Sequence, residues 1–171
     1  MDKLVTISQI SFKDIPQLVN MHHDPTMYTY DPDTEKVITE EIAGKYIRKA
    51  HKIWQEGTTY VFSIHNKENE FVGFITLRDV IKNSYAKIGF AIAKEQRKKG
   101  YVTAAIGELI KFATEILKLD IFEAYVAEEN IASLKALSKN GFVTIDPENS
   151  VGKFKPRENF IVLQRKKKNL I

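Results

Sequence analysis

The chain has 171 residues, of which 43% are hydrophobic and 28% are charged, which is enough for one domain with a sizeable core. It contains no cysteine, so disulfides, thiolate metal ligands and cysteine nucleophiles are excluded. The net charge is only +4, no apolar run reaches about 18 residues, and the N-terminal segment lacks the pattern of a signal peptide. We therefore expect a cytoplasmic protein that works without nucleic acid and without a membrane.

The first third of the chain predicts one strand and two helices. Residues 3–10 alternate apolar and polar side chains, as a strand does. Ser11 precedes a short amphipathic helix, and residues 22–33 then contain two prolines among turn-forming residues, which indicates a loop. A second helix begins after Thr39, where two acidic residues favour the helix dipole, and it ends at Gly57.

The middle of the chain predicts three strands and a long helix. Residues 58–65, 70–80 and 85–93 are rich in β-branched and aromatic side chains, and short polar turns separate them. Residues 101–118 repeat apolar side chains at helical spacing, so we expect a helix whose buried face includes Ile116.

The last third predicts a strand over 121–127, a helix between Asn130 and Gly141, and strands over 142–145 and 158–165. The full order is β, α, α, β, β, β, α, β, α, β, β, without an internal repeat or a clear linker. This order predicts a single domain over residues 1–171 with a mixed α/β sheet.

The end of the chain is basic. We expect residues 163–171 to form a solvated tail rather than a patch that binds nucleic acid.

One stretch combines positive charge, glycine and a helix start. Arg97, Lys98 and Lys99 precede Gly100, and the apolar helix pattern follows at once. A helix N-terminus has unpaired amide N–H groups and a partial positive charge, and a glycine lets the backbone approach an anion closely. A solvated loop would show the same residues, but the position between a central strand and a helix favours a phosphate site.

This stretch also resembles a known family signature. Arg97-Lys98-Lys99-Gly100-Tyr101-Val102 is similar to the Arg/Gln-x-x-Gly-x-Gly/Ala motif of the GNAT superfamily of N-acetyltransferases, which holds the diphosphate of acetyl-coenzyme A. Residues 88–92 resemble the cofactor-facing strand of that family. Asn130-x-x-Ser133 with Lys139-x-Gly141-Phe142 resembles its late helix, and residues 10–30 resemble the branch that acetylates ribosomal-protein N-termini.

The resemblance implies a central, mostly antiparallel sheet with two splayed strands, flanked by about four helices. Pantetheine would pair with the strand backbone near Ala91 and Ile92, and Asn130 would face the pantetheine arm. The implied cofactor-binding residues are Ala91, Ile92, Arg97, Lys98, Lys99, Gly100, Tyr101, Val102, Thr103, Asn130 and Ser133.

Two positions depart from the family pattern. Val102 stands where glycine or alanine is usual, so its methyl groups are expected to loosen the fit around the diphosphate. Leu137 stands where many members carry a tyrosine that is thought to protonate the leaving thiolate, and that role is not carried over.

Candidate catalytic and acceptor residues follow from the same resemblance. Ser133 is expected to hydrogen-bond the leaving sulfur, and Glu128 is a candidate base, although it also suits the helix dipole. Tyr28 and Tyr30 either line an acceptor pocket or pack over the core.

The adjacent His22, His23 and Asp24 suggest a metal pair, but neighbouring residues rarely point at one ion and no third ligand follows at useful spacing, so we expect no metal.

The sequence therefore predicts an acetyl-CoA-dependent N-acetyltransferase, monomeric or homodimeric, that moves an acetyl group to a primary amine on a protein N-terminus or a small molecule. Without a cysteine, transfer should be direct within a ternary complex. One alternative is a non-catalytic acyl-CoA sensor on the same fold. A nucleic-acid binder that uses Lys98 and Lys99 fits less well, because no aromatic stacking motif accompanies the basic residues.

Overall fold

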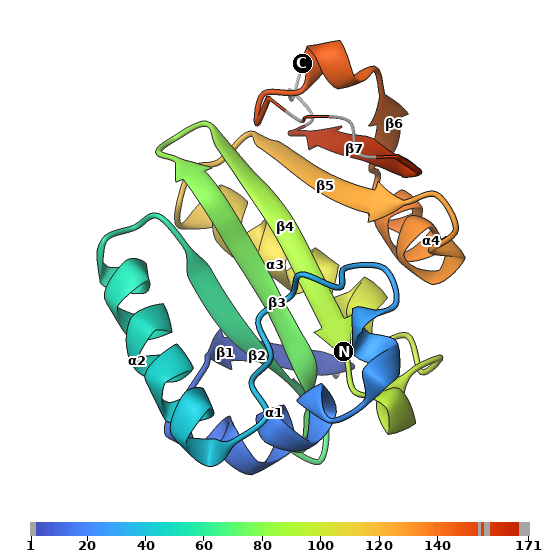
Figure 1. The fold of residues 1–171 in the computed structure, drawn as a ribbon. Helices are drawn as coiled ribbons and strands as arrows, with labels where there is room; N and C mark the ends of the chain where they lie inside the picture. Colours follow the sequence, from blue (N-terminus) through green and yellow to red (C-terminus); the bar gives the residue numbers. More distant parts are fainter. Residues whose placement is uncertain (1–2, 154, 156–157, 168–171) are drawn as a thin grey trace.

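The computed structural model describes residues 3–153, 155 and 158–167, which form a seven-stranded sheet in the order β1-β2-β3-β4-β5-β7-β6 (Figure 1). Its strands are β1 (Val5–Gln9), β2 (Tyr60–Asn66), β3 (Phe71–Ile81), β4 (Tyr85–Ile92), β5 (Ile121–Ala127), β6 (Val143–Ile145) and β7 (Phe160–Lys166). Neighbouring strands are antiparallel except for β4 and β5, which are parallel. The predicted mixed, mostly antiparallel sheet is confirmed.

Helices cover both faces of this sheet. They are α1 (Ile15–His22), α2 (Glu40–Gln55), α3 (Tyr101–Glu115) and α4 (Ile131–Lys139). Helix α3 packs with α4 and with β1, β3 and β4, whereas α1 packs with α2 and β3. Figure 1 shows α3 behind the sheet, so the opposite face of β3 and β4 is crossed mainly by the chain between α1 and α2. No helix in the described ranges is long and apolar enough to cross a membrane.

Local capping explains where the helices begin. The Thr39 hydroxyl accepts a hydrogen bond from the Ile42 N–H at 3.2 Å, and Asn130 Oδ1 accepts one from the Ser133 N–H at 3.2 Å. Gly100 precedes α3 in the left-handed conformation. All three helix starts were predicted from the sequence and are confirmed.

The main core lies between α3 and the sheet, where Ile106 and Leu109 are fully buried. Ile116, predicted on the buried face of the helix, is 65% exposed, so that prediction is wrong. The reason is that α3 ends at Glu115, and the turn that follows carries Ile116 out to solvent.

The predicted tail over residues 163–171 begins too early. Leu163 to Lys166 belong to β7, which lies between β5 and β6, and both Leu163 and Gln164 are buried there. Because β7 pairs with β5 on one side and with β6 on the other, the strand continues to Lys166 instead of ending where the tail was predicted to begin. Residues 168–171 lie outside the described part of the chain.

Strands β4 and β5 pair only at their beginnings. The pairs are Tyr85 with Ile121, Ala86 with Phe122, and Lys87 with Glu123. Beyond them the two strands diverge, as Figure 1 shows. The predicted splay is therefore present, and it positions the site.

Candidate functional site

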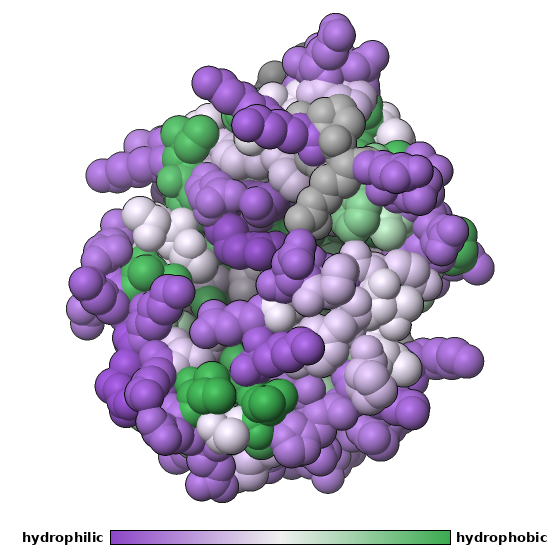
Figure 2. All heavy atoms as spheres, viewed as in Figure 1, coloured by the Kyte–Doolittle hydropathy of each residue, from purple (hydrophilic) through white to green (hydrophobic). Residues whose placement is uncertain are grey.

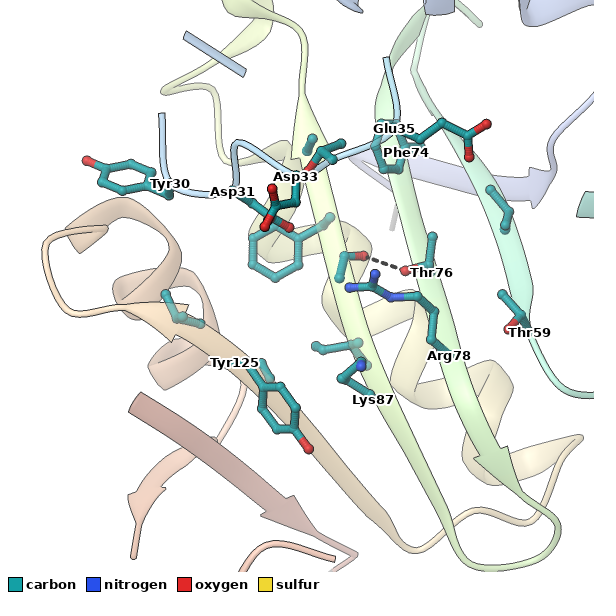
Figure 3. A pocket seen from close by; sticks show the side chains of 18 of the residues that line it. Tyr30, Asp31, Asp33, Glu35, Thr59, Phe74, Thr76, Arg78, Lys87 and Tyr125 are labelled. Atoms are coloured by element: carbon teal, nitrogen blue, oxygen red, sulfur yellow. Dashed lines mark hydrogen bonds between the residues drawn. The ribbon is translucent and has the colours of Figure 1, made fainter. Parts of the chain in front are cut away.

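A cavity of about 830 Å³ lies where β4 and β5 diverge. Residues Ile88 to Ala91 form one side and Ala124 to Ala127 form the other, and the start of α4 contributes Asn130 and Ser133. Figure 3 shows the chain before α2 passing over this space. Figure 2 shows that most of the surface on this side is hydrophilic.

The backbone of β4 presents alternate residues to the gap. The Ala93 N–H donates to the Val72 carbonyl on β3 at 2.9 Å, so Ala91, two residues earlier, also directs its backbone groups toward β3. Phe90 and Ile92 then direct theirs toward the gap. Of the two residues expected to pair with pantetheine, Ile92 therefore offers its N–H, since its carbonyl accepts a hydrogen bond from Arg97, and Ala91 lines the cavity with its backbone groups directed at β3.

Beyond the far end of β4, residues Arg97 to Gly100 lead into α3. They are the loop that the sequence predicts to bind phosphate, called the phosphate loop below. Gly100 has φ of +81°, and no side chain among the described residues caps the helix start. The N–H groups of the first turn, which includes Tyr101 and Thr103, therefore lack intrahelical partners. A Cβ on Gly100 would be 3.7 Å from Leu4 Cδ2, which is an ordinary contact. Glycine is therefore favoured here by the left-handed backbone conformation, not by a lack of room for a side chain.

The three basic residues of the loop differ in their surroundings. Lys98 is exposed with φ of +63°, and Lys99 Nζ donates to Gln96 Oε1 at 2.9 Å, so both ammonium groups stay at the surface of the loop. Val102, the departure from the family motif, packs against the main core, and its amide remains in the first turn of α3.

Arg97 is engaged within the protein. Its Nε donates to the Ile92 carbonyl at 3.2 Å, its Nη1 donates to the Thr26 hydroxyl at 2.8 Å, and its Nη2 contacts the Asp24 carboxylate at 3.1 Å. The hydrogen bond from the Thr26 hydroxyl, with smaller help from Arg97, keeps the pKa of Asp24 below its ordinary value. Arg97 therefore ties the phosphate loop to the chain after α1.

The start of α4 supplies part of the expected catalytic set. Ser133 lines the cavity, and so does Asn130, whose side-chain oxygen accepts the hydrogen bond that caps the helix. Glu128 has an exposed side chain and is absent from the cavity lining. Leu137 is fully buried in the main core and faces away from the cavity.

The two tyrosines predicted near the acceptor differ in their positions relative to the cavity. Tyr30 lines the cavity, and its hydroxyl donates to the Glu129 carbonyl at 3.5 Å. This hydrogen bond connects the chain before α2 to the residues just before α4. The Tyr28 hydroxyl donates to the His22 carbonyl at 2.9 Å, and Tyr28 lies outside the lining.

The two histidines do not converge on an ion. His22 is buried, stacks on Phe74 with ring centroids 6.2 Å apart, and lines the cavity. Burial lowers the pKa of His22 to about 4, so the ring is neutral near pH 7. The His23 ring instead contacts the Ile38 carbonyl at 2.8 Å. Among the described residues, no group of three His, Cys, Asp or Glu side chains could hold a metal.

Sequence reasoning missed one wall of the cavity. Phe74, Thr76 and Arg78 alternate along β3, so all three face the same side, and Lys87 joins them from β4 (Figure 3). Their two-residue spacing was the signal, because it places polar side chains on one face of a central strand whose other face is buried.

The sequence of this chain matches a known family. The family profile described as Acetyltransferase (GNAT) domain matches residues 5–143. The chain belongs to the GNAT acetyltransferase family. The family resemblance predicted from the phosphate loop is therefore confirmed, and the protein is an acyltransferase by family.

Individual GNAT proteins share less sequence than fold. An uncharacterized N-acetyltransferase, p20 of Bacillus licheniformis, is 28% identical over 81% of this chain and 78% of its own. RimJ of Mycobacterium smegmatis, solved in complex with CoA-disulfide, is 20% identical with a TM-score of 0.83, covering 97% of this chain and 83% of RimJ. The ribosomal-protein-S5-alanine acetyltransferase of Vibrio fischeri is 15% identical with a TM-score of 0.81, covering 99% and 96%.

A further structure shows how acceptors vary within this fold. The spermidine N-acetyltransferase of Vibrio cholerae, solved with CoA and spermine, is 19% identical with a TM-score of 0.74, covering 95% of this chain and 94% of its own. The structural likeness to the predicted ribosomal-protein branch is present, but it describes the fold and leaves the acceptor open.

Proposed function

We propose that this GNAT protein transfers the acetyl group of acetyl-CoA to a primary amine bound in the cavity between β4 and β5. The observation that carries the proposal is the divergence of the two strands after the pair formed by Lys87 and Glu123. It leaves strand backbone free to pair with a ligand, and the uncapped start of α3 lies at the end of the same strand.

Acetyl-CoA fits this arrangement in two places. The unpaired N–H groups of Tyr101 to Thr103 suit its diphosphate, with Lys98 and Lys99 adding positive charge. The backbone groups of Phe90 and the N–H of Ile92 suit the amides of pantetheine, which would extend the sheet like a short strand. Arg97 would act here by positioning the loop, since its guanidinium already has three partners.

Transfer would be direct. The chain has no cysteine to form a thioester, and among the described residues no base contacts the Ser133 hydroxyl. Backbone N–H groups facing the gap would polarise the thioester carbonyl as negative charge develops there. Ser133 would donate one hydrogen bond to the departing sulfur.

The acceptor would be an α-amino group. Such a group has a pKa of about 7.8, whereas a lysine-like amine has a pKa of about 10.4, so only the former is substantially neutral near pH 7.5. The candidate base Glu128 is exposed outside the cavity lining, and β4 carries Lys87 at the wall instead of a carboxylate. An acceptor that needs little help to lose its proton therefore fits best.

The test combines cofactor binding with turnover. Acetyl-CoA at about 100 times its dissociation constant should add roughly 2.7 kcal/mol to the free energy of unfolding, or about 5–10 °C in melting temperature. A panel of amines and N-terminal peptides is then assayed by thiol release, to which the protein itself adds no background. The absence of a melting shift with acetyl-CoA or CoA would overturn the proposal.

A second candidate is the non-catalytic acyl-CoA sensor, favoured by the buried Leu137 at the position of the family tyrosine. It predicts a melting shift with CoA and no thiol release with any amine. Intersecting double-reciprocal lines would support direct transfer, and parallel lines would contradict it.

A further inference from the structure

Arg78 places a guanidinium inside the cavity. It projects from β3 on the same side as Phe74 and Thr76, and Figure 3 shows its charged end reaching across β4. In the described part of the chain, Arg78 has neither a hydrogen bond nor an ion pair. Its guanidinium lies close to Gly89, where the Cβ of any larger residue would stand 2.6 Å from Arg78 Nη2, so the glycine leaves the room that the guanidinium occupies.

The neighbouring cation is already engaged. Lys87 Nζ lies 2.7 Å from the Asp79 carboxylate and 5.2 Å from the centre of the Tyr125 ring. Three further lysines, Lys49, Lys153 and Lys155, also line the cavity. Several cations therefore surround the cavity, and among the two on the β3 and β4 wall Arg78 is the one without an ion pair to a carboxylate.

The position of Arg78 separates it from the cofactor phosphates. Arg78 pairs in register with Lys87, the last β4 residue that still pairs with β5, so it stands at the closed end of the gap. The phosphate loop follows Ile92, and five residues of strand span about 16 Å. An anion bound by Arg78 would thus belong to the acceptor side of the cavity.

The opposite wall is acidic. The chain over the cavity contributes Asp31, Asp33 and Glu35 to the lining (Figure 3). A ligand with an amine and an anionic group at some distance from it could place the anionic group at Arg78 and its amine toward this chain. A polycation would meet the guanidinium of Arg78 instead.

We propose that the amine acceptor carries a carboxylate or phosphate group, which the guanidinium of Arg78 binds at the closed end of the gap. This assignment of the substrate class rests on the proposed acetyl transfer for the role of the amine. A guanidinium can bind either oxyanion through two parallel hydrogen bonds.

Binding is tested first, without turnover. Inorganic phosphate, 2-aminoethyl phosphate, 4-aminobutyrate and butylamine are titrated into the CoA-bound protein, and the amide resonance of Gly89 is followed by NMR. We expect the anionic probes to shift this resonance and butylamine to leave it unchanged. The dissociation constant of the anionic probes should rise at least about 10-fold in Arg78→Gln, the loss of one charge-assisted contact.

Two variants sharpen the result. Arg48→Gln removes an exposed arginine on α2 outside the cavity lining and should bind the probes like the wild type. Arg78→Lys keeps the charge without the planar fork and should fall between the wild type and Arg78→Gln. A stronger response to 2-aminoethyl phosphate identifies phosphate as the group bound, and a stronger response to 4-aminobutyrate identifies carboxylate.

Turnover supplies an independent readout. Arg78→Gln should raise the KM for α-amines that carry an anionic group about 10-fold or more and leave the KM for acetyl-CoA unchanged. Equal binding of the anionic probes by wild type and Arg78→Gln, or no binding by either, would overturn the anion site. If no amine releases thiol but the anions still bind through Arg78, the acetyl transfer fails and the anion site stands.

Discussion

At the scale of single residues, Gly100 combines a left-handed backbone conformation with a place in the proposed diphosphate site. Its φ of +81° is unfavourable for other residues, so Gly100→Ala should lower the free energy of unfolding by about 1–2 kcal/mol. Gly100→Glu adds a negative charge beside the proposed diphosphate site, where like charges cost several kcal/mol. The dissociation constant for CoA, measured by calorimetry, should then rise at least about 100-fold.

Gly57 is the matched control for this prediction. Its φ is +72°, it lies at the end of α2, and a Cβ there would make an ordinary 3.5 Å contact with the Tyr60 hydroxyl. Gly57→Ala should show the same loss of stability with unchanged CoA affinity. Equal CoA affinity in wild type and Gly100→Glu would place the phosphates elsewhere.

Ser133 is the residue from which we expect an effect on turnover alone. Ser133→Ala should lower turnover by roughly 10- to 1000-fold, the range from one modest hydrogen bond to a full transition-state donor. Cofactor affinity should change little. Ser138→Ala, on the exposed side of the same helix, is the control in steady-state assays. Unchanged turnover in Ser133→Ala would remove the proposed role of the serine.

His22 predicts how stability depends on pH. Burial lowers its pKa to about 4 from 6.5, so the folded protein holds the neutral ring while the unfolded chain takes up a proton. The contribution of about 3 kcal/mol is complete above pH 6.5 and is lost as the pH falls toward 4. The melting temperature of the wild type should therefore drop between pH 7 and 5 by more than that of His22→Gln.

His23→Gln is the control for this pH effect, since its ring lies outside the cavity and contacts the Ile38 carbonyl. It should keep the wild-type pH dependence. An equal drop in His22→Gln and wild type would show that another group is responsible.

At the scale of the elements, the buried carboxylate of Glu123 fixes the chain after β6 onto β5. One oxygen accepts from the N–H of Val151 at 2.8 Å, and the other accepts from the N–H of Gly152 at 3.2 Å and the hydroxyl of Ser150 at 2.8 Å. Burial by itself raises the pKa of Glu123, but the hydrogen bonds, led by that of Gln164, outweigh it and lower the pKa. The contact therefore stabilises the fold at neutral pH and weakens as the pH falls through the lowered pKa.

Replacing Glu123 by glutamine should break this attachment. Each carboxylate oxygen faces a backbone N–H, so either orientation of the amide sets its NH₂ group against a donor. We expect a loss of about 2–3 kcal/mol and a melting temperature lower by about 5–10 °C, measured by thermal unfolding. Glu148→Gln, exposed on the same connection, should change neither quantity, and a stable Glu123→Gln would contradict the role of the carboxylate.

The elements themselves were predictable because their signals are local. The caps at Thr39 and Asn130 and the glycine before α3 each act within a few residues, and all three helix starts were correct. The end of α3 was misjudged because the apolar spacing continues through Ile116 after the helix has stopped.

The parts of the site that escaped prediction depend on distant pairs. Nothing near Arg97 in the sequence indicates that its partners are Asp24 and Thr26, more than seventy residues away. The two-residue spacing placed Arg78 on one face of β3, but the open space beside it exists only because β5, a later strand, diverges from β4. Sequence patterns therefore predicted the loop between β4 and α3, and tertiary packing decided what its arginine contacts.

At the scale of the whole molecule, the sheet consists of two parts joined by three residue pairs between β4 and β5. Strands β1 to β4 form one part and β5 to β7 form the other. The main core, shared by α3 and both parts, holds them together on one face. A ligand between the strands would therefore bridge the two parts of the sheet.

The same divergence creates two strand edges in the middle of the molecule. Over Ile88–Ile92 and over Ala124–Ala127, each strand is paired on one side only. Open edges of this kind are templates on which other chains can add a strand, and proteins normally shield them. If acetyl-CoA binds between the strands as proposed, the protein without it should be more prone to self-association, and the bound cofactor would protect these strand edges as a chaperone does.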